Sequence, residues 1–250
     1  MSAPARFLAT LGFLSRLAPA RVLPQDDLRR MMIHLPLCGL VIGAVVGAAV
    51  ALPAALGLLH GRPQVQAWLA VALLAYLTRG LHLDGLADVA DAAAAHVEPE
   101  RFWAIIKDSR SGAFGVVALV LALGGQGVLF AEMLKHGQWW AVIWAVVFGR
   151  ACAVVFGFCA RTYVRPGLGG LFLAGASPAA ALWAVACALA PALWLWPLAA
   201  AWAVAAALIL LAPLRRLVTA VNGINGDFLG AAITLGELSA ALGFALASSA

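Results

Sequence analysis

The segment RGLHLDGLADVAD, residues 79–91, is the stretch around which the chain is organised. It holds three aspartates, Asp84, Asp88 and Asp91, although the whole chain of 250 residues has only 11 acidic side chains. Spacings of four and then three residues place all three carboxylates on one side of a helix, if the segment is helical. Like charges at these spacings repel and destabilise a helix by roughly 0.2–0.5 kcal/mol per pair. We therefore expect a cation among them.

The residues on both sides of this segment are apolar, over 68–77 and again over 92–95. In a soluble protein the ordinary explanation would be a solvated acidic helix end. Acids within an apolar chain are costly, however, and are most often functional. The segment has no thiol and one optional imidazole, so its oxygen donors suit a hard cation such as Mg²⁺, which bridges carboxylates to substrate phosphates. The sequence therefore predicts a divalent metal site here.

The composition of the chain determines its class. Hydrophobic residues make up 64% and charged residues 11%, far below the roughly one-quarter charged content of soluble domains. No polar linker or charge block divides the chain, so we expect a single domain over 1–250. The four cysteines are scattered without a CxxC pair and are interpreted as small buried apolar residues. The predicted fold is all-α: a polytopic integral membrane helix bundle.

Hydropathy along the chain predicts about seven transmembrane helices. Segment 179–214 has no charge over 36 residues. A single helix of that many residues, at a rise of about 1.5 Å per residue, would be much longer than a hydrocarbon core of about 30 Å is thick. Two spans in a hairpin fit better. Segment 65–77 is short and crosses only if its helix continues into the acidic segment. The expected spans are 35–59, 65–77 with its continuation, 114–134, 139–158, two within 179–214, and 228–247.

Segment 98–108, EPERFWAIIKD, predicts a short helix near 99–108. Pro99 is well placed at a helix start, and the apolar residues that follow, Phe102 and Trp103 among them, form one face. We expect this helix to lie in the membrane interface, anchored by Trp103.

The distribution of cationic residues predicts that the N-terminus is inside. Five lie in the N-terminal segment, four over 79–110, three over 150–165 and two at 215–216, and only Arg62 and Lys135 fall on the other side. This split follows the positive-inside rule. It also explains the net charge of +5 without nucleic acid, with anionic lipid as the partner. All conspicuous polar clusters then lie on the cytoplasmic face.

A second polar cluster is KDSRSG, residues 107–112, directly before an expected span. Its ordinary explanation is positive-inside anchoring by Lys107 and Arg110. Asp108, between the two cations, is less easily explained in this way and is a candidate catalytic residue. Lys107, Ser109 and Arg110 are candidate ligands for substrate phosphate.

A third cluster is NGINGD, residues 222–227, directly before the last expected span. Asn-Gly pairs favour a turn, which is the simplest interpretation. The segment also offers amide oxygens from Asn222 and Asn225 and a carboxylate from Asp227 to a metal or a phosphate.

Two further residues are singled out by their setting. Glu237 falls within the last expected span, where a buried acid needs a partner, and Arg150 is a candidate. His82 lies beside Asp84 and could act as a base, although a lone histidine is more often structural.

Three segments resemble the cobalamin synthase family, whose members are adenosylcobinamide-GDP ribazoletransferases. They are HLDGLADVAD at 82–91, KDSRSGAFG at 107–115 and NGDFLGAAITLGEL at 225–238, and their order and separation match the family. The stretch over 30–39, ending HLPLCG, is similar to the family region before its first span. Ala92 departs from the glycine common in the family, and Asn225 stands where threonine is usual.

The resemblance implies an integral inner-membrane, Mg²⁺-dependent enzyme, with its active site on the cytoplasmic face, that joins α-ribazole or its 5′-phosphate to adenosylcobinamide-GDP and releases GMP. The attack of a ribose hydroxyl on a diphosphate needs neutralised phosphoryl oxygens and removal of a proton. The expected metal ligands are Asp84, Asp88, Asp91 and Asp227. Lys107, Arg110 and Arg150 would clamp phosphate oxygens, and Asp91 or His82 would accept the proton.

Other classes of protein fit the sequence less well. The acids at 88 and 91 are similar to part of the CDP-alcohol phosphotransferase signature, but the continuation of that signature is missing. A cation transporter would place its acids near the bilayer midplane rather than at one face. A structural scaffold would not need three aligned acids. Glycines at 39, 43 and 47 permit close helix packing within one chain or between subunits, so the oligomeric state stays open.

Overall fold

The computed structural model describes all residues except 22, 96–97, 109 and 249–250. The described residues are mostly helical, with one isolated β-bridge, which joins Val164 to Ile224. Short 3-10 turns lie at Met32–His34 and Arg161–Tyr163. The helices are α1 Ala3–Leu14, α2 Gln25–Leu28, α3 Leu35–Ala55, α4 Pro63–Leu77, α5 Leu81–Ala94, α6 Pro99–Ile106, α7 Ala113–Lys135, α8 Trp139–Cys159, α9 Leu168–Leu173, α10 Pro178–Leu195, α11 Pro197–Ala220 and α12 Gly226–Ser248.

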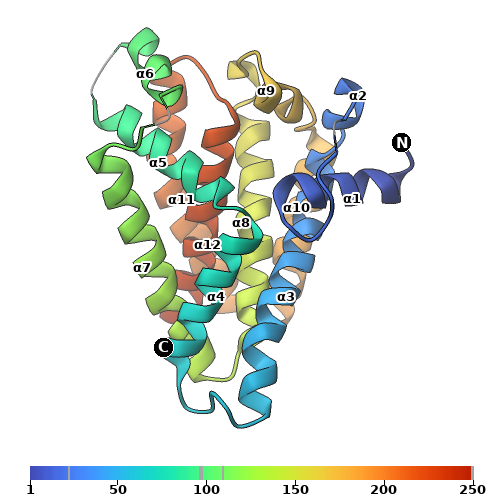
Figure 1. The fold of residues 1–250 in the computed structure, drawn as a ribbon, viewed down its shortest axis with the longest axis vertical. Coiled ribbons are helices and arrows are strands. Elements are labelled where there is room, and N and C mark those ends of the chain that lie inside the picture. Colours follow the sequence, from blue (N-terminus) through green and yellow to red (C-terminus); the bar gives the residue numbers. More distant parts are fainter. Residues whose placement is uncertain (22, 96–97, 109, 249–250) are drawn as a thin grey trace.

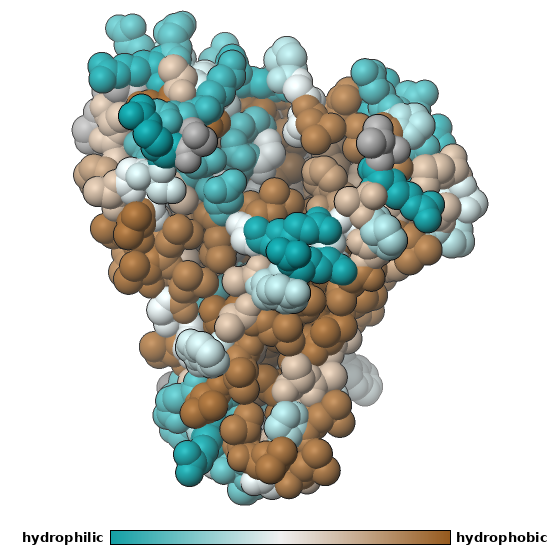
Figure 2. All heavy atoms as spheres, in the orientation of Figure 1, coloured by the Kyte–Doolittle hydropathy of each residue, from teal (hydrophilic) through white to brown (hydrophobic). Residues whose placement is uncertain are grey.

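The predicted all-α membrane bundle is confirmed. Six helical segments are long and apolar enough to cross a membrane: the one that ends in α3, and α7, α8, α10, α11 and α12. The count rises to seven if α4 and α5 together make one broken span. On the face drawn in Figure 2, hydrophobic side chains cover most of the middle of the bundle apart from one hydrophilic group, and hydrophilic side chains gather at the two ends.

The uncharged segment 179–214 forms two helices, as predicted. α10 ends at Leu195 and α11 begins at Pro197, with Trp196 between them in a non-helical conformation. Proline suits the first position of a helix because its missing N–H would have no partner there. The predicted short helix near 99–108 is also present, as α6, but Trp103 is buried inside the protein and donates to the Val221 carbonyl at 3.1 Å, so it does not anchor the helix in the membrane interface as expected.

The helix over 65–77 does not continue into the acidic segment, as a straight span would require. α4 and α5 meet at an angle of 87°. Arg79 and Gly80 both have positive φ, 56° and 68°. The Gly80 amide donates to the Ala75 carbonyl at 2.9 Å and the Arg79 amide to Tyr76 at 3.2 Å, which is the hydrogen-bond pattern of a Schellman motif. This motif ends α4 and turns the acidic helix away from its axis.

α12 is the central helix of the bundle and packs against α5, α7, α8 and α11 (Figure 1). Its contact with α8 is close because Gly236 faces Gly149, where a Cβ atom at either glycine would clash with the opposite helix. The glycines at 39, 43 and 47 pack against α8 in the same way, so this stripe serves packing within the chain.

The polar end of the bundle

The acidic helix α5 crosses the N-terminal end of α12 at close range. A Cβ atom at Gly85 would lie 2.7 Å from the backbone oxygen of Asp227, and one at Gly230 would lie 3.2 Å from the Cα of His82. Only residues without a side chain permit these approaches. The two helices thereby bring Asp227 beside the acids of α5, although 136 to 143 residues separate them in the sequence.

The four predicted acidic ligands form one electrostatic group. Asp88 lies close enough to Asp84, Asp91 and Asp227 to feel their negative charges, and Asp227 also feels Asp84. Asp84 is exposed and the other three are half-buried. Among the described residues no three His, Cys, Asp or Glu side chains are arranged to hold a metal ion. The donors are oxygens, as Mg²⁺ prefers, and Mg²⁺ commonly takes one or two carboxylates together with substrate phosphates.

Asp91 has a structural role that the sequence did not reveal. Its Oδ2 accepts a hydrogen bond from the Gly112 amide and its Oδ1 accepts one from the Gly115 amide, both at 2.7 Å. These amides lie at the start of α7, where backbone N–H groups have no helical partner. The carboxylate therefore caps α7 and fixes the second polar cluster beside the first.

In the second cluster Asp108 is paired with Arg110. The Arg110 Nη2 donates to Asp108 Oδ2 at 2.6 Å and its Nε to Oδ1 at 3.0 Å. The side-chain hydrogen bond from Arg110, aided by the Arg110 backbone amide, lowers the pKa of Asp108 to about 2. Asp108 is thus ionised at neutral pH. Lys107 and Arg110 are exposed, and Ser109 lies outside the described residues.

The third cluster is a turn that also caps α12. The Asn225 Nδ2 donates to Asp227 Oδ2 at 2.6 Å, and the Phe228 amide lies 3.5 Å from Asn225 Oδ1. Asn222 is exposed and has a positive φ of 46°. The bridge between Val164 and Ile224 ties the turn to the segment after α8. The turn predicted for this segment is therefore present, and it presents Asp227 to α5.

Behind α5 lies a buried polar network. The predicted pair of Arg150 with Glu237 is confirmed, with the Arg150 Nη1 donating to Glu237 Oε1. The Arg150 Nη2 lies 3.4 Å from His82 Nδ1, and Gln126 Nε2 donates to Glu237 Oε2 at 2.7 Å. Arg150 is fully buried and its guanidinium is paired with Glu237, so it presents no exposed surface to a phosphate. The sequence analysis did not identify Gln126 as part of this network. The signal that could have revealed it is a single amide side chain within an apolar span.

An open cavity of about 460 Å³ adjoins the acids. It is lined by Arg79, Asp84 and Ser111, together with apolar residues from α1, α5 and α7. Its volume falls in the range of small-molecule sites. The Arg79 guanidinium is held in place by the Gly12 carbonyl at 3.1 Å. The sequence analysis did not single out Arg79 or Ser111 as site residues. Arg79 is one of many cations predicted on the cytoplasmic side, and Ser111 has no distinguishing sequence pattern.

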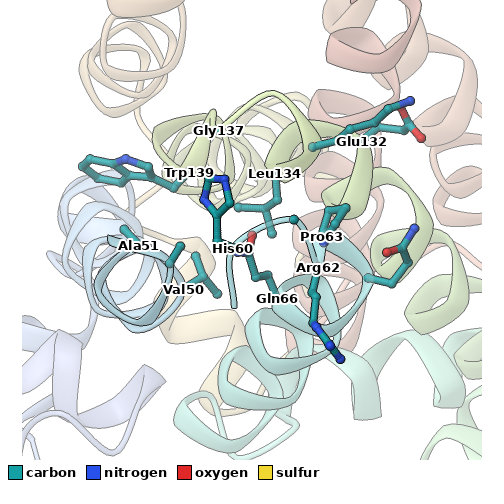
Figure 3. A pocket seen from close by; sticks show the side chains of 14 residues that line it. Val50, Ala51, His60, Arg62, Pro63, Gln66, Glu132, Leu134, Gly137 and Trp139 are labelled. Carbon is teal, nitrogen blue, oxygen red and sulfur yellow. The ribbon is translucent and has the colours of Figure 1, made fainter. Parts of the chain in front are cut away.

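A second polar pocket, of about 480 Å³, lies at the opposite end of the bundle (Figure 3). It is lined by His60, Glu132 and the two cations that the charge distribution placed on the other face, Arg62 and Lys135. None of the four clustered aspartates lines this pocket, so it is not part of the acidic site.

These features define a class, a polytopic helical membrane protein that gathers acids and cations at one end, as an enzyme acting on phosphate-bearing substrates requires. The family model described as cobalamin-5-phosphate synthase matches residues 6–245. The chain belongs to this family.

Curated relatives extend the match over nearly the whole chain. The adenosylcobinamide-GDP ribazoletransferase of Nitratidesulfovibrio vulgaris (strain Miyazaki F) is 45% identical over 244 residues, which cover 94% of this chain and 93% of the relative. The protein of the same name from Klebsiella pneumoniae (strain 342) is 36% identical over 247 residues, 93% and 96% of the two chains. No solved structure matches the chain.

Proposed function

We propose that this chain joins α-ribazole, or its 5′-phosphate, to adenosylcobinamide-GDP at the polar end of the bundle, in a reaction that requires Mg²⁺. The observation that carries the proposal is the contact of Gly85 with Asp227, which collects four carboxylates beside a cavity and exposed cations. Family membership and the names of the relatives support the choice of substrates.

The reaction is a displacement at phosphorus. A ribose hydroxyl of the ribazole attacks the phosphorus that is bonded to the cobinamide. The bond from that phosphorus to the bridging oxygen breaks, GMP leaves with this oxygen, and the hydroxyl proton passes to a base. The product is adenosylcobalamin, or its 5′-phosphate. The protein must hold both substrates in line and neutralise the phosphoryl oxygens.

One or two of the carboxylates of Asp84, Asp88 and Asp227, together with phosphate oxygens of the substrate, would hold Mg²⁺. Bound there, the ion would neutralise charge on the diphosphate. Asp91 is the fourth candidate, although both of its oxygens already accept amide hydrogen bonds from α7. Each carboxylate oxygen has a second lone pair, so capping and metal binding are compatible.

The cations of the second cluster would hold the phosphates. Lys107 and Arg110 are exposed at the start of α7, and the pair of Arg110 with Asp108 is solvent-exposed and thus weak enough to open. Ser109, Asn222 and Asn225 would add hydrogen bonds. Arg150 would not bind phosphate directly. It is buried behind α5, contacts His82 and so positions that helix.

The proton acceptor is proposed to be Asp91 or His82. Asp108 is a weaker candidate because its pKa of about 2 makes it a poor base. Of the first two, His82 is the weaker, because its Nδ1 faces the Arg150 guanidinium, which can only donate, so the neutral ring carries its proton on the buried Nε2. We also propose that the whole site lies on the cytoplasmic face of the bacterial inner membrane, and the asymmetric distribution of cationic residues supports this orientation.

The test uses the purified protein in lipid with adenosylcobinamide-GDP, α-ribazole and Mg²⁺. GMP release and a ribazole-linked corrinoid should appear together and stop with a chelator. Asp84→Asn and Asp88→Asn should lower turnover by at least about a hundredfold, since each removes charge that the transition state needs. Asp26→Asn, which changes an exposed acid far from the cluster in sequence, is the matched control. Folded Asp84 and Asp88 variants with full metal-dependent turnover would refute the assignment.

A further inference from the structure

A groove of about 560 Å³ runs along the bundle between α8, α10 and α11. All of its lining residues are apolar except Arg215, and all three helices are long and apolar enough to cross a membrane. The groove is separate from the polar site, since it shares no lining residue with the cavity beside the acids.

The length of the groove matches one leaflet of a bilayer. Its lining begins at Phe148 on α8 and Val204 on α11 and ends at Cys159 and Arg215. Eleven residues of helix rise about 16 Å. Half of a hydrocarbon core of about 30 Å is about 15 Å. A groove of this length would reach from the middle of a bilayer to its headgroups, and its end at Cys159 and Arg215 lies towards the polar end of the bundle, where α8 finishes.

Arg215 lies at one end of this groove and has a guanidinium N–H group without a hydrogen-bond acceptor. Its guanidinium lies over the ring of Tyr163, at 5.2 Å from the centroid. Its Nη1 is buried and finds no hydrogen-bond acceptor among the described residues. A buried charged donor without an acceptor is unfavourable, so an anionic ligand at this point would stabilise it.

We propose that the groove binds an anionic phospholipid, with its phosphate on Arg215 and one acyl chain along α8 and α11. The groove is apolar and about as long as one leaflet is deep, which suits an acyl chain, and a guanidinium is well suited to bind a phosphate. Basic pockets between membrane helices on the cytoplasmic side are known to take acidic headgroups. Because the Tyr163 carbonyl accepts from the Ile224 amide at 2.8 Å, the bound lipid would also brace the turn that carries Asp227.

Native mass spectrometry of the purified chain tests this proposal, with phosphatidylglycerol and phosphatidylcholine of identical acyl chains as probes. The wild type should retain phosphatidylglycerol preferentially. Arg215→Gln should weaken that binding about tenfold, as loss of a charge-assisted hydrogen bond predicts, whereas Arg216→Gln, at the exposed next residue, should not. Equal retention by the Arg215 variant, or equal binding of the two lipids, would overturn the proposal.

A second variant tests the acyl-chain half of the groove. Leu208 is 70% exposed and lines the groove, so Leu208→Trp should fill it and release the lipid while Arg215 stays intact. Leu193→Trp, at an exposed position of α10 outside the groove, is the control. Displacement of the lipid by glycerol phosphate would show a headgroup site without a chain. A dimer that Leu208→Trp dissociates would assign the groove to a second copy. Either outcome would overturn the proposal.

Discussion

The guanidinium of Arg150 on α8 pairs with the carboxylate of Glu237 on α12 in the interior of the bundle, where their side chains are 0% and 5% exposed. Removing one partner of such a pair leaves an uncompensated charge in an apolar environment. Because Arg150 also contacts His82 on α5, the pair links the central helix of the bundle to the acidic helix.

Glu237→Gln is expected to destabilise the protein by about 3–5 kcal/mol, because it leaves Arg150 buried and unpaired. The double variant Arg150→Met with Glu237→Leu should be more stable than Glu237→Gln, since it removes both charges together. Thermal unfolding in detergent measures both effects. Glu132→Gln, at a half-exposed acid of α7, is the control and should change stability little. A loss below about 1 kcal/mol for Glu237→Gln would contradict the prediction.

Gly85→Ala is expected to reduce turnover about 10- to 100-fold by forcing α5 away from Asp227. The added Cβ atom would lie 2.7 Å from the Asp227 backbone oxygen, and backbone at this contact has little freedom to move. Gly124→Ala is the matched control, because a Cβ atom there meets nothing within 4 Å. Steady-state kinetics at saturating Mg²⁺ distinguish the two variants; equal activity would show that the approach of the two helices is unimportant for the reaction.

Asp91→Ala is expected to free the first turn of α7. The Gly112 and Gly115 amides lose their acceptor, which should cost about 1–2 kcal/mol and speed hydrogen exchange over 112–116. Asp88→Ala should leave that exchange unchanged. Protection that survives in the Asp91 variant would mean that another group caps the helix.

Asp108 should not produce the acidic limb of the pH–activity profile. Arg110 lowers the pKa of its carboxyl from 3.8 to about 2, so the ion pair is fully present above about pH 4 and is lost as the pH falls towards 2. Asp108→Asn is therefore expected to leave the shape of the profile unchanged between about pH 5 and 9. A shifted limb in this variant would assign the titration to Asp108.

Much of the fold follows from the sequence because membrane helices are constrained by length and charge. The break at Trp196 was predictable, since 36 uncharged residues exceed one span and a proline marks the restart. The partner of Glu237 was predictable for a related reason: a buried acid needs a cation, and Arg150 was available in another span.

The details of the site were less predictable, because they depend on contacts between distant segments. Asp91 accepts from amides 21 and 24 residues away, and no local pattern reveals such a cap. The bend between α4 and α5 depends on Arg79 in a left-handed conformation that arginine rarely adopts. The approach of α5 to α12 rests on Gly85, whose role is visible only when the opposing backbone is known.

The bend after α4 has a consequence for the lipid around the protein. A helix of 15 residues rises about 22 Å, less than the roughly 30 Å of a hydrocarbon core. If α4 and α5 make one broken span, α5 turns away at 87° and adds little depth, so the bilayer would thin beside α4 or the acidic helix would lie below the plane of the phosphates. Membrane thickness thus sets how far a water-soluble corrinoid must descend to reach the carboxylates.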